Sequence, residues 1–70
     1  MKNNYGAILK QYRRDAKITQ KQMAELYQKE FKEAIHWKSF SLAERCKVCP
    51  NANMILIYLN YCHIPIDELL

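Results

Sequence analysis

The chain has 70 residues, of which 50% are hydrophobic and 26% charged, with one glycine and two prolines. Such a length holds one domain with one small core, which excludes a large enzyme with a separate cofactor domain. The composition is too apolar for a disordered tail and too poor in turn residues for a many-stranded β domain, so it predicts an all-α fold. Eleven Lys and Arg against seven Asp and Glu give a net charge of +4, which favours an anionic partner such as nucleic acid.

The cysteine count and the apolar runs bear on where the protein resides. Three cysteines are an odd number, which argues against a closed disulfide framework. The first residues contain no apolar run of signal-peptide length, and the longest apolar run, residues 54–59, is far shorter than the about 20 residues of a membrane-spanning helix. We therefore expect a cytoplasmic protein with reduced thiols and no membrane partner.

Two amphipathic helices are predicted in the first half of the chain. Apolar residues recur at helical spacing over residues 5–16, namely Tyr5, Ile8, Leu9, Tyr12 and Ala16. Thr19 and Gln22 then have the spacing of a capping box, which predicts a second helix from Gln20 to about residue 30 or 31. Its inward stripe is Met23, Ala24, Tyr27 and Phe31.

Three further helices are predicted in the second half. The third covers about residues 37–45, with Phe40 and Ala43 facing inward. Asn51 can cap a fourth helix that ends near Cys62 and is mostly buried, because residues 54–59 are apolar without interruption. Pro65 then turns the chain into one last helical turn over residues 66–70, which makes five helices in a single domain, residues 1–70.

The order and spacing of these elements carry a resemblance to a known family. An Arg lies near the end of the first helix, a T-Q-x-x-M-A segment opens the second, an A-E-R-C segment closes the third, and a Pro-Asn step and an I-P-I-D-E-L segment follow. The chain resembles the XRE-type helix-turn-helix family, which includes lambda-repressor-like and Cro-like regulators. The resemblance implies a compact five-helix DNA-binding domain that acts as a small transcriptional regulator, in the first place a repressor.

Two features depart from the family pattern. About six extra residues lie between Ala24 and Glu44, which is typical of variants with a lengthened second helix and turn. Cys46 stands where the family places its C-cap Gly, and a side chain there disfavours the left-handed backbone that Gly allows. We therefore expect a different loop after the third helix.

The resemblance also implies which residues contact DNA. With the third helix in the major groove, Trp37, Lys38, Ser41 and Leu42 face the base edges. Lys38 can donate to guanine, Ser41 can bond either class of base, and the two apolar residues can contact thymine methyls. In the alternative reading, Trp37 and Leu42 are core residues and Lys38 is a solvated charge.

Phosphate contacts and one structural ion pair follow from the same resemblance. Gln20 can bind phosphate through its amide beside the first N–H groups of its helix, unless it is only a surface residue at a helix start. The other expected phosphate contacts are basic, namely Lys10, Arg14, Lys21, Arg45 and Lys47. Arg13 and Glu44 are expected to form an ion pair, within about 4 Å, that ties the first helix to the third.

Metal and catalytic sites are not expected. Cys46-x-x-Cys49 and Cys62-His63 have the residue types of a zinc site, but a helix between Cys49 and Cys62 separates them by about 16 Å. The C-x-x-C pair also lacks the strand–loop–helix context of redox enzymes. His36 and His63 have no nucleophile and acid in a recognisable arrangement, so the chain is predicted to be neither an enzyme nor a cofactor-binding protein.

The fourth helix suggests a homodimer. If Ile55, Tyr58, Leu59 and Cys62 form its core face, then Met54, Ile57, Tyr61 and the terminal Leu70 remain on an adjoining apolar stripe. Such a stripe predicts contact with a second copy, unless it is covered within the chain. A second reading of the whole chain is an antirepressor or inhibitor that keeps this fold but binds a protein, because the third helix has few base-reading side chains.

Overall fold

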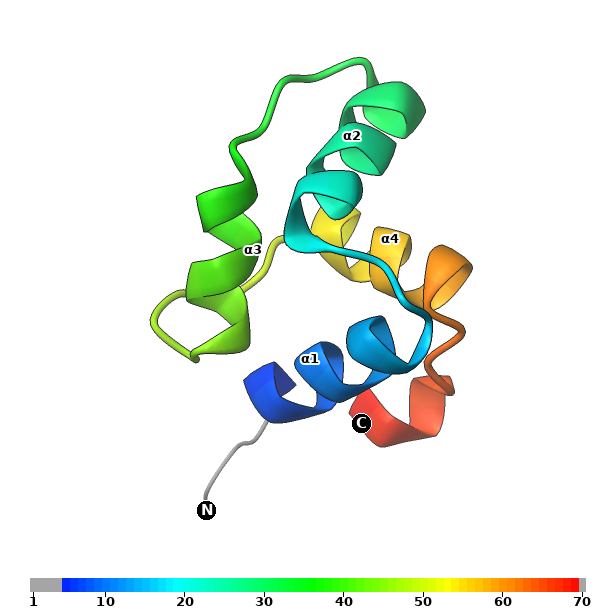
Figure 1. Ribbon diagram of the computed structural model, residues 1–70. Coiled ribbons are helices and arrows are strands. Elements are labelled where there is room, and N and C mark those ends of the chain that lie inside the picture. The colour runs from blue at the N-terminus through cyan, green and yellow to red at the C-terminus, as the bar shows by residue number, and fades with distance from the viewer. Residues whose placement is uncertain (1–4, 70) are drawn as a thin grey trace.

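The computed structural model describes residues 5–69, which contain four α-helices and one short 3₁₀ helix (Figure 1). The α-helices are α1 (Tyr5–Asp15), α2 (Gln20–Phe31), α3 (Trp37–Glu44) and α4 (Ala52–Tyr61), and the 3₁₀ helix is η1 (Ile66–Leu69). No strand occurs in this part of the chain. The all-α prediction is confirmed, and the four predicted α-helices are each correct to within one residue at either end.

The predicted fifth helix is wrong. Residues 66–69 form a 3₁₀ helix of four residues, in which the N–H of Glu68 donates to the carbonyl of Pro65 at 3.0 Å. A segment this short after a proline closes i→i+3 hydrogen bonds but does not extend into an α-helix. Leu70, at its end, lies outside the described residues.

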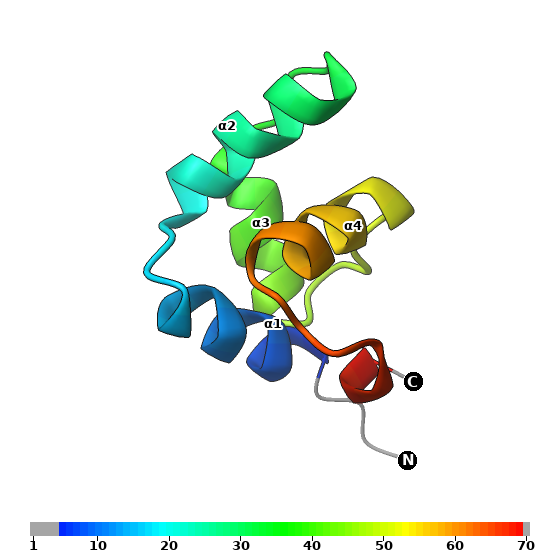
Figure 2. The same ribbon diagram turned by 90° about the vertical axis from the view of Figure 1, so that its right-hand side faces the viewer.

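The helices are arranged so that α3 and α4 lie on different sides of the molecule. Residues 32–36 leave the far end of α2 and bring the chain back along it into α3 (Figure 1). Seen from the side, α4 lies in front of α3, and η1 is at the same end of the molecule as α1 in both views (Figure 2). The segment between Ala24 and Glu44 that is longer than in the family pattern therefore forms the last turn of α2 and residues 32–36.

The starts of three helices are capped by side chains. At α2, the N–H of Gln22 donates to Thr19 Oγ1 at 3.1 Å, and the N–H of Thr19 donates to Gln22 Oε1 at 2.8 Å, so the predicted capping box is confirmed. Asn51 caps α4 as predicted, accepting from the N–H of Met54 at 2.8 Å. At α3 the cap is the imidazole of His36, whose Nδ1 accepts from a main-chain N–H.

Each of the four α-helices is followed by a non-glycine residue with positive φ, namely Lys17, Lys32, Cys46 and His63. At Cys46, φ is 60°, the N–H donates to the Ala43 carbonyl at 3.1 Å, and the next N–H, of Lys47, donates to the Leu42 carbonyl at 2.9 Å. These two bonds form the Schellman motif that usually contains glycine. The expectation of a different loop is therefore wrong, because the hydrogen bonds offset the cost of a left-handed side-chain residue, about 1–2 kcal/mol.

The core is a single cluster that draws on all four α-helices. Phe40 lies at its centre, with its ring centroid 6.2 Å from that of Tyr27 and 5.9 Å from that of Tyr58. Most residues predicted to face inward on α1, α2 and α3 are buried or half-buried, whereas Tyr5 is 40% exposed. The buried hydrophobic residues are Leu9, Met23, Tyr27, Phe40, Ala43, Met54, Ile57, Tyr58, Cys62 and Ile64.

The predicted inward face of α4 is correct for Tyr58 and Cys62, which are buried, whereas Ile55 and Leu59 are half-buried. Met54 is 4% exposed and Ile57 is 0% exposed, so neither lies on a free stripe, and Tyr61 is half-buried. Because α4 packs against both α1 and α2, its buried sector is wider than a single stripe and includes the residues assigned to a second copy. The dimer-interface assignment of Met54 and Ile57 is therefore wrong, and homodimerisation stays a prediction without an assigned surface.

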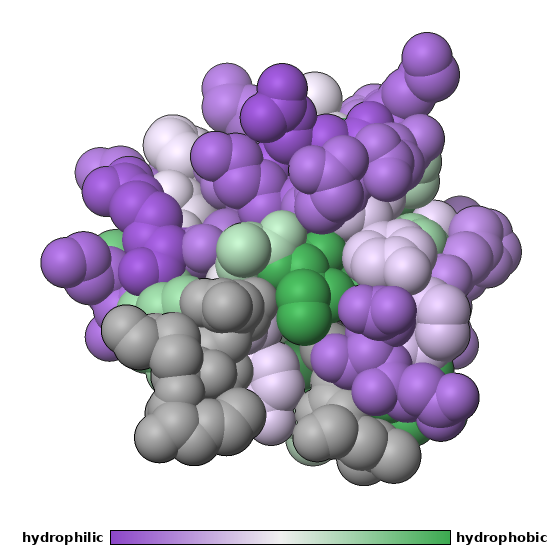
Figure 3. Space-filling model, turned by 90° about the horizontal axis from the view of Figure 1, so that it is seen from below, coloured by the Kyte–Doolittle hydropathy of each residue, from purple (hydrophilic) through white to green (hydrophobic). Residues whose placement is uncertain are grey.

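The outer surface is largely hydrophilic on the side of α1 and η1. In that view hydrophobic residues are seen at the centre and in smaller areas toward the edges, among hydrophilic residues (Figure 3). In the described part of the chain, no helix is long and apolar enough to cross a membrane.

Gly6 is the point at which α1 comes closest to α3. A Cβ at this position would overlap the carbonyl oxygen of Glu44, and would lie 2.7 Å from the carbonyl carbon of Glu44 and 2.8 Å from Cys46 Sγ. Since two of these atoms belong to the main chain, they cannot move aside without separating the helices. The single glycine of the chain therefore sets the distance between α1 and the end of α3.

We predict that Gly6→Ala lowers the free energy of unfolding by about 1–3 kcal/mol, because the added methyl group has no space. In an unobstructed helix the same change would instead stabilise by up to about 1 kcal/mol, so the sign of the effect is the test. Urea unfolding followed by circular dichroism measures it, with the exposed neighbour Ala7→Gly as a control for helix propensity alone. A Gly6→Ala variant at least as stable as the wild type would contradict the close contact.

Candidate nucleic-acid interface

The free face of α3 and the turn after it carry most of the residues expected to meet DNA. Lys38, Arg45 and Lys47 are exposed, Leu42 is 39% exposed, and Trp37 is half-buried. Lys38 and Leu42 are four residues apart and so lie one above the other on one face of the helix. The structure thus brings together one cationic and one apolar side chain on the predicted recognition surface, with two more cations beyond the helix end.

Ser41 is not part of this surface. It is 7% exposed, and its Oγ accepts a hydrogen bond from Arg45 Nη2 at 3.1 Å. The turn of α3 that buries Phe40 and Glu44 also carries Ser41 inward, because these residues occupy adjoining positions around the helix. The assignment of Ser41 as a base contact is therefore wrong, and the same hydrogen bond ties the side chain of Arg45 to α3.

The start of α3 lies beside the face of α2 that runs from Lys21 to Gln28. A shallow groove of about 250 Å³ is lined by Lys21 and Glu25 from α2 and by His36 and Trp37 from α3, together with Ala24, Gln28 and Ile35. The rings of His36 and Trp37 lie 5.6 Å apart. The ammonium group expected to contact phosphate, on Lys21, and the indole expected to contact bases thus border the same depression.

The position of α3 is set by the predicted ion pair, which is confirmed. Arg13 Nε donates to Glu44 Oε2 at 2.7 Å, and Arg13 Nη2 donates to Glu44 Oε1 at 3.1 Å, so the pair is bidentate. Both side chains are buried, and Arg13 Nη1 also donates to the carbonyl of Ile18 at 2.7 Å. The guanidinium therefore fixes the α1–α2 turn as well as α3.

Two further donors on Glu44 were not anticipated from the sequence. The hydroxyl of Tyr58 donates to Glu44 Oε2 at 2.6 Å, and Gln20 Nε2 donates to Glu44 Oε1 at 3.1 Å. The signal for Tyr58 was available, since a tyrosine within a buried apolar run needs a partner for its hydroxyl. The amide of Gln20, expected on phosphate, is instead half-buried and committed in part to α3.

Burial raises the pKa of two groups in or beside the hydrogen bonds to Glu44, namely Tyr58 and Cys62. Burial, together with the hydrogen bond to Glu44, raises the pKa of Tyr58 well above its usual range, so its hydroxyl stays a donor. Burial likewise raises the pKa of the Cys62 thiol from its ordinary value of 9.0 to about 11. Cys62 is 4% exposed and lies 3.9 Å from the sulfur of Met23, so its neutral thiol is part of the core.

No metal-binding cluster is found among residues 5–69: no three side chains of His, Cys, Asp or Glu gather there in a way that could hold an ion. Cys46 and Cys49 are exposed, whereas Cys62 is buried in the core, so the structure does not bring the third thiol to the C-x-x-C pair.

The chain was compared with protein families, curated proteins and solved structures. No family model, no curated protein and no solved structure matches it.

We predict that the protein loses stability as the pH rises from about 9 to 11. In the unfolded chain Cys62 ionises near pH 9, whereas in the folded chain it keeps its proton to about 11, so the folded state is increasingly disfavoured over this interval. The contribution of Cys62 is about 2–3 kcal/mol, from two pKa units. Denaturant titrations at several pH values give the free energy of unfolding of the wild type and of Cys62→Ala. The contribution of Cys62 is the difference between the two proteins in how steeply this free energy falls with pH.

The exposed thiol of Cys49 provides the control, since Cys49→Ala removes a cysteine without removing a buried one. The Cys62→Ala variant is expected to be less stable at pH 7 but to have a flatter pH dependence than either of the other proteins. Equal slopes for the wild type and Cys62→Ala would contradict the burial of this thiol.

Proposed function

We propose that the chain is a small transcriptional regulator that binds double-stranded DNA through the exposed face of α3. The observation that carries the proposal is the distribution of charge. Between Glu33 and Asp67 the only acidic residue is Glu44, and its carboxylate is buried against Arg13. The cations of α3 and its following turn, Lys38, Arg45 and Lys47, are thus left without a neighbouring surface carboxylate in this stretch of sequence.

The start of α2 supports the same proposal. The capping box uses the N–H groups of Thr19 and Gln22, which leaves those of Gln20 and Lys21 at the start of the helix, and α2 has no acidic residue in its first turn. Lys21 lies in that turn and is exposed, while Gln20 next to it is anchored to Glu44. A phosphate at this position meets main-chain donors, the positive end of the helix dipole and one ammonium group.

The fold order agrees with the resemblance to XRE-type helix-turn-helix regulators. In that arrangement α2 and α3 are the helix pair, joined by residues 32–36, and α3 occupies the major groove. Lys38 donates to guanine, Leu42 contacts a thymine methyl, and Arg45 and Lys47 lie on phosphates. The buried pair of Arg13 and Glu44 then holds the reading helix at a fixed angle to the rest of the domain.

A protein partner is the second candidate. It is favoured by the apolar side chains on or next to the same face, since Leu42 is 39% and Val48 46% exposed. It is favoured also by the loss of Ser41 from the set of base-reading residues. In that case the fold serves an antirepressor or inhibitor, and the cations meet an acidic protein.

The proposal is tested by selection from random-sequence duplex DNA, followed by sequencing of the retained fraction. We expect an enriched motif, and binding that weakens steeply as salt concentration rises, because cationic side chains displace counterions from phosphate. A protein that retains no DNA at low salt would exclude the DNA-binding proposal and leave the protein-binding one.

We predict different effects for two lysines on the selected site. Lys38→Ala reduces discrimination between the selected site and a mutated one by about 1–3 kcal/mol, whereas Lys21→Ala weakens binding to all duplexes alike and lowers the salt slope by about one unit. Fluorescence anisotropy at several salt concentrations separates the two.

The matched control is Lys29→Ala, which removes an exposed charge from the last turn of α2 rather than from its first. Its affinity is expected to stay closer to that of the wild type than the affinity of either other variant. If Lys38→Ala has the same base preference as Lys29→Ala, Lys38 does not read DNA.

A further inference from the structure

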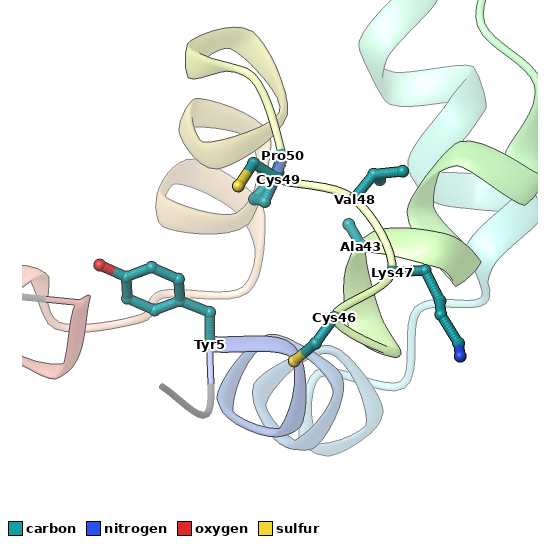
Figure 4. Close-up of a pocket in the computed structure, with 7 residues that line it drawn as sticks. All are labelled: Tyr5, Ala43, Cys46, Lys47, Val48, Cys49 and Pro50. Atoms are coloured by element: carbon teal, nitrogen blue, oxygen red, sulfur yellow. The ribbon is translucent and has the colours of Figure 1, made fainter. Parts of the chain in front are cut away.

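The C-x-x-C pair after α3 borders a pocket, and the proposed function makes no use of its two thiols. The pocket has a volume of about 290 Å³ and is lined by Cys46, Cys49, Tyr5, Ala43, Lys47, Val48 and Pro50. Both thiols are free and exposed. Figure 4 shows Cys46 Sγ directed toward α1 and Cys49 Sγ on the side nearer α4, and both residues line the same pocket.

We propose that Cys46 and Cys49 form a thiol–disulfide exchange site that reacts with low-molecular-weight disulfides of the glutathione type and closes into an intrachain bridge. The two residues are three apart, and the chain bends at residues 47 and 48 between them. A disulfide needs Cα atoms about 4.4–6.8 Å apart. Because the two sulfurs point in different directions (Figure 4), closing the bridge requires the bent segment of residues 46–49 to move. The site adjoins the surface assigned to DNA, because Lys47, one of the proposed phosphate contacts, also lines the pocket.

The exchange proceeds in two steps. The thiolate of Cys49 attacks one sulfur of the small disulfide, the original S–S bond breaks, and one small thiolate leaves, so that a mixed disulfide is formed on Cys49. The thiolate of Cys46 then attacks the Cys49 sulfur and releases the second small thiolate. Two protein thiols are thus oxidised to one disulfide, and the small disulfide is reduced to two thiols.

The packing of the two sulfurs decides this order. Cys46 Sγ lies against α1, 2.8 Å from where a Cβ on Gly6 would be, so one side of it is covered by main chain. Cys49 Sγ lies away from α1, on the side nearer α4, and Cys49 is followed by Pro50 (Figure 4). The thiol that is not packed against α1 meets the small disulfide first, and Cys46 serves to resolve the adduct.

Closing the bridge acts on the end of α3. Cys46 is the left-handed residue of the Schellman motif, and its sulfur fills the contact between α1 and the carbonyl end of α3. Turning this sulfur toward Cys49 removes that contact and strains the cap. The bridged protein is therefore expected to be less stable than the reduced one.

The third cysteine gives an internal control. Cys62 is 4% exposed and packs on Met23, and burial raises the pKa of its thiol. Because the thiolate is the nucleophile in exchange, Cys62 in the folded protein stays free while the other two react.

The experiment is incubation of the folded chain with oxidised glutathione at pH 8, followed by intact mass spectrometry and thermal unfolding. We expect the wild type and Cys62→Ala to lose two hydrogen atoms without a lasting adduct, whereas Cys46→Ser stops at one glutathione adduct on Cys49. The unfolding midpoint of the bridged wild type is expected to fall by at least about 4 °C.

Three results would overturn the proposal. The first is a wild type that stays reduced or carries adducts without bridging. The second is labelling of Cys62 in the folded protein as fast as that of Cys49. The third is a bridged protein with the midpoint of the reduced one, since Cys46 would then have kept its contact with α1.

Discussion

The carboxylate of Glu44 is the acceptor on which the other three helices converge. It receives two hydrogen bonds from Arg13 on α1, one from Gln20 on α2 and one from Tyr58 on α4, at 2.6–3.1 Å. Its side chain is only 2% exposed, so each of these donors replaces water that a buried carboxylate would otherwise lack. Any displacement of α3 breaks several charge-assisted bonds at once.

The burial of this ion pair also determines which charged side chains remain on the surface near α3. The charge of Arg13 is neutralised by Glu44 inside the domain, where a bidentate pair fixes geometry more than it adds stability. The charge of Glu44 is neutralised in the same pair, and Glu44 is the only acidic residue between residues 33 and 67. The remaining cations of α3 and its turn therefore face outward, on a helix whose orientation is held from behind. A helix held in one orientation, with cations on it and in the turn after it, supports the proposed recognition of a duplex.

The close contact at Gly6 and the cap at Cys46 belong to the same arrangement. Gly6 lets the main chain of α1 approach the carbonyl of Glu44, and the sulfur of Cys46 packs into the same contact. The carboxylate, the helix end and the thiol are thus neighbours along three consecutive residues, 44–46. We therefore expect a chemical change of the Cys46 thiol to alter the C-terminal end of α3, the helix that we propose reads DNA.

Sequence reasoning predicted the features that depend on local patterns. The helix bounds and the caps at Thr19 and Asn51 follow from residue types within one turn of each other, and Arg13 and Glu44 were paired through the family resemblance. Tyr58 and Gln20 were missed because their contact with Glu44 spans 14 and 24 residues of sequence. The burial of Met54 and Ile57 was missed because residues 54–59 are all apolar, so periodicity cannot say how wide the inward side of α4 is.

The role of Glu44 as the common acceptor is tested most directly by the stability of Tyr58→Phe, which removes one donor and leaves the ring in place. We expect a loss of about 1.5–3 kcal/mol in the free energy of unfolding, the range for a hydrogen bond to a charged group. Tyr61→Phe, on the same helix, is the control, because the Tyr61 hydroxyl has no such partner among the described residues, and it should change stability by less than about 0.5 kcal/mol. Equal losses for the two variants would contradict the account, whereas a selective loss for Tyr58→Phe is what it predicts.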